Sequence, residues 1–151
     1  MIIIGSDHSG IEYKNDIIED LKKNNINYID VTKVNEPQDD YPDIAKIICK
    51  KVLENNDNYG IAICGTGVGI SIACNKIKGI RAAVCTDEYM AKMSRIDNDA
   101  NILCLGARLN IANDKKKVEK IVQAFINTEF GAGRHERRVQ KIKKLEIEGG
   151  N

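Results

Sequence analysis

Short apolar runs alternate along this chain with amphipathic helical patterns, and this alternation constrains the fold more than any other feature. Five runs predict strands, at about residues 1–6, 28–31, 60–64, 80–85 and 102–105. Apolar residues at helical spacing predict helices at about 10–24, from 42, from 68, from 87, at 114–127 and at 134–146. Strands that alternate with helices favour a parallel sheet covered on both faces. We therefore expect an α/β fold.

Length and charge narrow the class of protein. The chain has 151 residues, enough for one domain with a real core, and we predict a single domain over residues 1–151. A net charge of +1 gives no general attraction for nucleic acid or a membrane surface, so neither is expected as a partner. The apolar start at residues 1–4 is too short for a signal peptide or a membrane span.

The five cysteines indicate a cellular compartment. They form no C-x-x-C pair, and Cys49, Cys74, Cys85 and Cys104 lie inside apolar segments, where we interpret them as core residues. This usage suits free thiols in a reducing environment, so we predict a cytoplasmic protein. The cysteine spacing matches no zinc pattern, and no metal site is predicted.

Cys64 differs from the other cysteines because it ends a predicted strand and leads into three alternating glycines, Gly65, Gly67 and Gly69. Glycines allow backbone conformations in which successive N–H groups turn toward one negatively charged ligand. The helix predicted to follow adds the positive end of its dipole, which also stabilises a thiolate. The segment therefore predicts an anion site with a thiol at its rim.

Nucleotide-binding motifs are the first alternative for this loop. The dinucleotide fingerprint G-x-G-x-x-G is not matched, because Ile70 follows directly after the third glycine and the spacing is one residue short. Asp87 lies at roughly the distance of a ribose-binding acid, which keeps a nucleotide site open. A P-loop is excluded, because no glycine is followed by Lys and then Ser or Thr.

Polar residues follow the ends of four predicted strands. Parallel sheets bind ligands at the carboxyl ends of their strands, so these residues are expected at one edge. Solvated turns also carry polar residues, but the coincidence with the glycine loop favours a site. The four segments are Ser6-Asp7-His8, Cys64-Gly65-Thr66, Thr86-Asp87-Glu88 and Gly106-Ala107-Arg108.

The predicted C-terminal helix carries a basic face. Arg134 and Arg138 are spaced i, i+4 and project from one side, whereas Val139, Ile142 and Leu145 form the other. Taken alone, such a run is typical of a solvated helix. Two converging arginines can also bind an oxyanion through bidentate, charge-assisted hydrogen bonds.

Five ordered motifs resemble the ribose-5-phosphate isomerase B family, which also includes galactose-6-phosphate isomerase subunits. The resemblance covers almost the whole chain. The motifs are Gly5-Ser6-Asp7-His8-Ser9-Gly10, Asp40-Tyr41-Pro42-Asp43, Cys64-Gly65-Thr66-Gly67-Val68-Gly69, Asn98-Asp99-Ala100-Asn101 with Gly106-Ala107-Arg108, and Gly133-Arg134-His135-Glu136-Arg137-Arg138-Val139.

This resemblance implies a fold, an assembly and a reaction. The fold is a Rossmann-like three-layer sandwich with a five-stranded parallel sheet and a C-terminal helix. The assembly is a homo-oligomer, a dimer or a dimer of dimers, whose active sites draw residues from both subunits. The reaction is the reversible conversion of D-ribose 5-phosphate to D-ribulose 5-phosphate through a cis-enediolate, without a metal or an organic cofactor.

The resemblance also implies roles for individual residues. Cys64 is the base that moves a proton between C1 and C2, and Asp7 holds the sugar hydroxyls or shuttles a proton between oxygens. The donors that meet the enediolate are the Thr66 hydroxyl and the backbone N–H groups of Gly65, Gly67, Val68 and Gly69. The remaining substrate-binding residues are His8 near the substrate, Tyr41 in the pocket wall, Asn98 on the sugar, and Arg134, Arg138 and Arg108 on the phosphate with His135 assisting.

One position departs from the family pattern. Asp97 stands where many ribose isomerases of the family carry the histidine that opens the sugar ring. A carboxylate accepts a proton at neutral pH but donates one poorly. Three explanations are open. Asp97 opens the ring with a perturbed pKa, His8 opens the ring instead, or the substrate is a hexose 6-phosphate such as galactose or allose 6-phosphate. A non-catalytic sugar-phosphate-binding module remains the alternative from another class.

Overall fold

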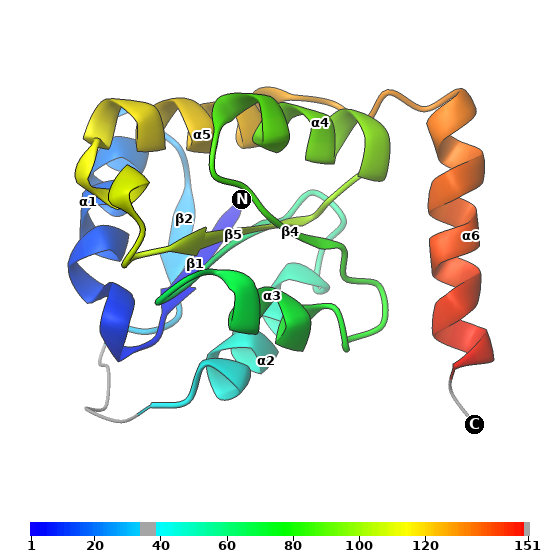
Figure 1. The fold of residues 1–151 in the computed structure, drawn as a ribbon, viewed down its shortest axis with the longest axis horizontal. Helices are drawn as coiled ribbons and strands as arrows, with labels where there is room; N and C mark the ends of the chain where they lie inside the picture. The colour runs from blue at the N-terminus through cyan, green and yellow to red at the C-terminus, as the bar shows by residue number, and fades with distance from the viewer. Residues whose placement is uncertain (34–38, 150–151) are drawn as a thin grey trace.

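The structure is a computed structural model that describes residues 1–33 and 39–149. Predicted strands and helices occur in the expected order (Figure 1). The strands are β1 (Ile2–Ser6), β2 (Tyr28–Asp30), β3 (Tyr59–Cys64), β4 (Ala82–Val84) and β5 (Ile102–Gly106). The α-helices are α1 (Ile11–Lys23), α2 (Tyr41–Val52), α3 (Val68–Cys74), α4 (Glu88–Asn98), α5 (Lys115–Asn127) and α6 (Arg134–Glu148).

Two short 3₁₀ helices and a shorter fourth strand are the local differences from the prediction. The helices η1 (His8–Gly10) and η2 (Asn110–Asn113) follow β1 and β5. Strand β4 begins at Ala82 rather than at residue 80, because the N–H of Ile80 closes a turn onto the carbonyl of Ile77 at 3.1 Å. A backbone N–H committed to a turn cannot join the sheet ladder.

All five strands are parallel and lie in the order β2-β1-β3-β5-β4. Strand β3 is central: Ser6 of β1 pairs with Ile63, and Gly106 of β5 pairs with Cys64. The ends of β1, β3 and β5 therefore meet at one edge, which we call the carboxyl edge. Each helix that follows a strand runs back toward the opposite edge, where the next strand begins.

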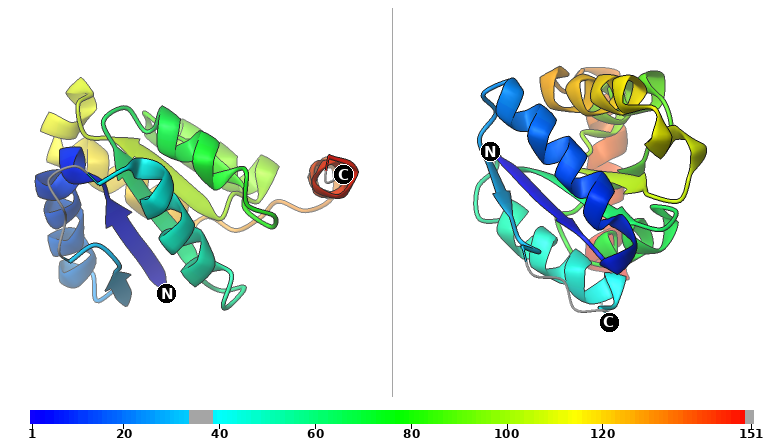
Figure 2. Two further views of the ribbon diagram at one scale, coloured as in Figure 1. Left: turned by 90° about the horizontal axis from the view of Figure 1, so that it is seen from below. Right: turned by 90° about the vertical axis from the view of Figure 1, so that its left-hand side faces the viewer.

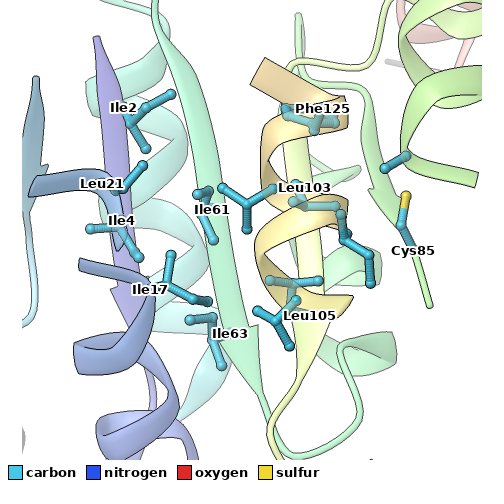
Figure 3. Packing of buried hydrophobic residues seen from close by; sticks show 14 of the residues in the cluster. Ile2, Ile4, Ile17, Leu21, Ile61, Ile63, Cys85, Leu103, Leu105 and Phe125 are labelled. Carbon is cyan, nitrogen blue, oxygen red and sulfur yellow. The ribbon is translucent and has the colours of Figure 1, made fainter. Parts of the chain in front are cut away.

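Side chains alternate between two apolar layers on the faces of the sheet. Ile61 and Ile63 point toward the layer that α1, α4 and α5 cover, and Figure 3 shows this packing. Ala62 and Cys64 point toward the layer that α2 and α3 cover. The predicted three-layer arrangement is thus confirmed, and it places the Cys64 sulfur on the α2–α3 side.

Helix α6 stands apart from both layers (Figures 1 and 2). It contacts α4, and Val139 is its single buried residue. Leu145 and Ile147 are about two-thirds exposed, at 65% and 67%. The apolar side of α6 therefore covers little of this copy of the chain.

Arg95 fastens the end of α4 to the sheet. Its side chain is 3% exposed and donates to the carbonyl oxygens of Ala100 (2.6 Å) and Thr128 (3.2 Å). It also pairs with Asp99 at 3.0 Å, and its guanidinium lies 4.5 Å from the centre of the Tyr59 ring while donating to the Tyr59 hydroxyl at 2.9 Å. A buried cation with this many partners holds several segments in one arrangement.

Among the residues described, no helix combines the length and the apolar character needed to cross a membrane. All five cysteines are free and buried; the sequence predicts this for Cys49, Cys74, Cys85 and Cys104, whereas Cys64 is expected at the rim of an anion site.

Replacing Arg95 with Ala should destabilise the protein strongly. The change leaves the Ala100 carbonyl without its donor and leaves Asp99 with Arg81 as its remaining ion-pair partner. Hydrogen bonds to a charged group contribute about 1.5–3 kcal/mol each, and Arg95 makes several. Urea denaturation followed by circular dichroism measures the loss. Lys92→Ala, at an exposed position of the same helix, should change the free energy of unfolding by less than about 0.5 kcal/mol. Equal stabilities of the two variants would contradict the role of Arg95.

Candidate active site

The loop between β3 and α3 surrounds the Cys64 sulfur with backbone. The N–H of Gly67 donates to Cys64 Sγ at 3.2 Å, and the thiol is 4% exposed. Gly67 has a φ of +78°, and a Cβ added there would lie 3.0 Å from the carbonyl carbon of Leu105. Only glycine combines this backbone conformation with such close packing. The sulfur accordingly accepts a hydrogen bond from a donor that the glycine positions.

The same loop is attached to the end of β5. The N–H groups of Ala107 and Arg108 donate to the carbonyl oxygens of Cys64 and Gly65, both at 2.9 Å. The Arg108 side chain lies over Gly65, because a Cβ added there would be 3.2 Å from Nη1. The Tyr41 ring lies over Gly69 in the same way, with Cζ 2.9 Å from an added Cβ. Two predicted site residues thus flank the glycine loop.

Some donors of the predicted anion site are committed to the loop itself. The N–H of Gly67 binds the sulfur, and the N–H of Val68 donates to the Thr66 hydroxyl at 3.3 Å. Helix α3 has only seven residues, so its dipole contributes little. The thiol therefore depends on this nearby amide more than on the helix.

Asp7 and His8 lie beside this loop at the end of β1. The Asp7 N–H donates to the carbonyl of Ile63 at 3.1 Å, which places Asp7 next to Cys64 across the sheet. Its 6% exposed side chain accepts hydrogen bonds from the N–H and the hydroxyl of Ser9, at 2.9 and 2.5 Å. The His8 ring is 44% exposed, with Nδ1 3.3 Å from the Asp39 carboxylate. Ser9 and Asp39 are orienting residues that the sequence analysis did not single out.

These residues form what we call the thiol half-site. Its members are Asp7, His8, Tyr41, Cys64, Gly65, Thr66, Gly67, Val68, Gly69 and Arg108.

The other predicted residues lie at the opposite edge of the sheet. Asp97 and Asn98 end α4, and the chain then enters β5. The carbonyl of Asn98 accepts a hydrogen bond from Arg81, which precedes β4. Figure 1 shows α4 ending on the side where α6 stands. The five residues of β5, about 13 Å of extended chain, separate this group from Cys64.

We call this second group the arginine half-site. Its members are Asp97, Asn98, Arg134, His135 and Arg138. One copy of the chain does not bring the two half-sites together.

His135 is the centre of the arginine half-site. Its side chain is 12% exposed, and its Nδ1 lies 3.4 Å from Asp97 Oδ1. At this distance the two side chains form an ion pair only when the imidazole is protonated, and the buried Nδ1 has no hydrogen-bond partner among the described residues. Arg134 Nε donates to the other ring nitrogen, Nε2, at 3.4 Å. Arg134 and Arg138 are exposed, whereas Val139, one helical turn after His135, packs inward.

The remaining cysteines belong to the core. Burial raises the pKa of Cys85 to about 11. A hydrogen bond with Cys74, together with burial, raises the pKa of both Cys49 and Cys104. A thiol with a raised pKa is rarely ionised at neutral pH and is therefore a poor nucleophile. Hydrogen bonds with Cys104 and Cys49 lower the pKa of Cys74, but this thiol is completely buried in the layer beneath α2 and α3.

Comparison with known proteins decides the family. A family model described as Ribose/Galactose Isomerase matches residues 2–142. The chain belongs to the ribose/galactose isomerase family. A probable ribose-5-phosphate isomerase B of Mycoplasma genitalium is 42% identical over 149 residues, which are 97% of this chain and 96% of the relative.

Solved structures agree with this membership. The ribose-5-phosphate isomerase B of Clostridium thermocellum is 45% identical, with a TM-score of 0.89 and 99% of each chain covered. The enzyme of Mycoplasma genitalium, solved with bound ribulose-5-phosphate, is 41% identical, with a TM-score of 0.88 and coverage of 97% of this chain and 96% of that one. The prediction of a sugar-phosphate isomerase is thereby confirmed.

Gly67→Ala should lower both stability and turnover. The left-handed conformation costs a non-glycine residue about 1–2 kcal/mol, and the crowding against Leu105 moves the N–H away from the sulfur. Thermal unfolding and the isomerisation rate measure the two effects.

Gly79→Ala is the matched control for this variant. Gly79 has a φ of +87°, but an added Cβ would meet only the flexible Leu53 side chain, at 3.1 Å. It should lose similar stability and keep its turnover. Full turnover by Gly67→Ala would show that this amide does not serve the chemistry.

Proposed function

We propose that this protein interconverts D-ribose 5-phosphate and D-ribulose 5-phosphate through a cis-enediolate, with Cys64 as the base and without a metal or an organic cofactor. The observation that carries the proposal is the hydrogen bond from the Gly67 N–H to the Cys64 sulfur at the carboxyl edge. The bound ribulose-5-phosphate in the 41% identical structure supports the choice of substrate.

The thiol half-site supplies what the proton transfer needs. Cys64 removes a proton from the carbon beside the carbonyl and returns it to the neighbouring carbon, so one base on one face serves both steps. The hydrogen bond from the Gly67 N–H stabilises negative charge on the sulfur when Cys64 is a thiolate. Asp7, held by Ser9, faces the same loop and hydrogen-bonds the sugar hydroxyls. The Thr66 hydroxyl and the loop amides other than those of Gly67 and Val68, which are committed to the loop itself, stabilise the enediolate.

The phosphate requires a second copy of the chain. Arg134 and Arg138 are exposed on α6, which stands on the side where α4 ends (Figure 1), whereas Arg108 lies over Gly65, the residue after Cys64. A homodimer that places the arginine half-site of one copy on the thiol half-site of the other assembles a complete site. A two-fold axis makes two such sites at once. Binding the phosphate away from the reacting carbons then holds C2 beside the thiolate.

Asp97 keeps a hexose 6-phosphate as the second candidate substrate, because the family histidine is absent there. Rates with ribose 5-phosphate, galactose 6-phosphate and allose 6-phosphate, measured without added metal, separate the candidates. Fastest turnover of ribose 5-phosphate supports the proposal. Turnover of a hexose phosphate alone contradicts the pentose assignment, and no turnover of any of the three favours a binding module.

Cys64→Ala should abolish isomerisation and leave the binding of the sugar phosphate nearly unchanged. Loss of a general base lowers turnover by about 10²–10⁴-fold. Coupled assays measure the rate, and calorimetry measures ligand affinity. Cys85→Ala removes a thiol from the opposite apolar layer and should remain active. Undiminished turnover by Cys64→Ala would exclude this cysteine as the base.

Mixing two inactive variants should restore activity if the site is shared. A heterodimer of Cys64→Ala and Arg138→Ala has one site with both residues intact, so random subunit exchange should regain about a quarter of wild-type activity. Mixing Cys64→Ala with Asp7→Asn is the control, because both changes damage the same half-site and leave no intact site. Equal failure of the two mixtures would contradict the shared site.

A further inference from the structure

The proposed substrate must open before it can isomerise. An aldopentose 5-phosphate such as ribose 5-phosphate closes into a furanose, in which ring oxygen O4 is bonded to C1. Opening breaks the C1–O4 bond, forms the C1=O1 carbonyl, places a proton on O4 and removes the proton of the O1 hydroxyl. The step therefore needs a group that both accepts and donates protons near neutral pH, which is the usual task of a histidine.

The chain contains two histidines, one in each half-site. His8 is 44% exposed and is engaged with Asp39 through both its backbone N–H and its ring. His135 is 12% exposed and lies between Asp97 and Arg134. His135 is thus the more enclosed of the two, and it sits among the arginines assigned to the phosphate.

The pair of His135 with Asp97 has the arrangement of an acid–base group with its orienting carboxylate. Asp97 Oδ1 lies 3.4 Å from the buried Nδ1, so a small rotation of either side chain makes a hydrogen bond that fixes the imidazole ring. Nε2 lies on the other side of the ring, where Arg134 donates to it at 3.4 Å, a long and weak contact. A bound sugar can therefore displace Arg134 from Nε2 and contact this nitrogen.

The chemistry of the substrate favours this place. The phosphate is carried by C5, and O4 is carried by the adjacent carbon, C4. A group beside the phosphate-binding arginines consequently lies near the ring oxygen. A carboxylate at position 97 accepts a proton but does not readily deliver one to O4.

We propose that His135 opens the sugar ring, donating a proton to O4 and accepting the proton of O1, and that Asp97 is its positioning residue. The inference rests on the reaction and the shared site proposed above. It assigns ring opening to the imidazole of His135 on α6, which contacts the Asp97 side chain, rather than to the residue at position 97 on α4.

Two rates measured on the same protein test the proposal. The first is the turnover of ribose 5-phosphate, which includes ring opening. The second is the exchange of a C1 proton of ribulose 5-phosphate for deuterium in D₂O, followed by NMR. Ribulose 5-phosphate cannot form a furanose, because its O5 carries the phosphate, so this exchange requires Cys64 but no ring opening.

His135→Asn should lower the turnover of ribose 5-phosphate by about 10²–10⁴-fold and leave the exchange rate within a few-fold of wild type. Asp97→Asn should lower the same turnover less, again with exchange preserved. Adding Asp97→His to His135→Asn should restore part of the turnover, because an imidazole returns to the same contact. Arg137→Ala, an exposed cation on α6, should change neither rate.

Other outcomes overturn the proposal. A parallel fall of both rates in His135→Asn, with a raised KM for both sugars, would assign His135 to phosphate binding alone. Unchanged turnover in both His135→Asn and His135→Gln would exclude it from the reaction. Preserved exchange shows that a variant is folded. Wild-type protein that exchanges no proton from ribulose 5-phosphate would instead refute the proposed function, and with it this inference.

Discussion

Parallel pairing of β3 with β1 and β5 is the constraint on which the rest of the structure depends. The register sets Cys64 opposite Gly106 and Ile63 opposite Ser6, so three strands end together. The strand period of two then decides the faces: Ile63 enters the layer beneath α1 and α5, and Cys64 turns toward α2 and α3. A register shift of one residue would exchange the side chains of β3 between the two apolar layers and move the thiol to the face covered by α1 and α5.

The length of the sheet has a functional consequence. Helices that run back along parallel strands end at the edge of the sheet opposite the carboxyl edge. Helix α4 ends there and so places Asp97 at that edge. Arg95 holds this end of α4 by donating hydrogen bonds to the Ala100 and Thr128 carbonyls and the Tyr59 hydroxyl, and so holds the backbone that carries Asp97. The proposed assembly follows from this geometry, because each copy presents half of a site at each edge.

The hydrophobic pattern of the sequence did not predict which charged side chains are buried. Lys14 is 2% exposed and bonds to Asp30 and to the carbonyl of Thr32, yet in the sequence it is one lysine among many on an amphipathic helix. Arg95 is hidden in the same way. Periodicity reports which residues are apolar, whereas the burial of a cation depends on partners that are distant in sequence. The Asp7–Ser9 hydrogen bond was not predicted, but the sequence carries a signal for it, because Asp-x-Ser spacing is typical of a local capping turn.

The sequence by itself determined the order of strands and helices, the parallel sheet, the glycine loop beside Cys64 and the family. These follow from local periodicity, from the backbone freedom of glycine and from ordered motifs. Only the tertiary structure decided that Asp97 and His135 meet, and that they meet far from their own Cys64. Contacts between α4 and α6 depend on how whole helices pack, and the separation of the half-sites depends on the length of the strands between them. Neither the contact between Asp97 and His135 nor the separation of the half-sites follows from the residue at any single position.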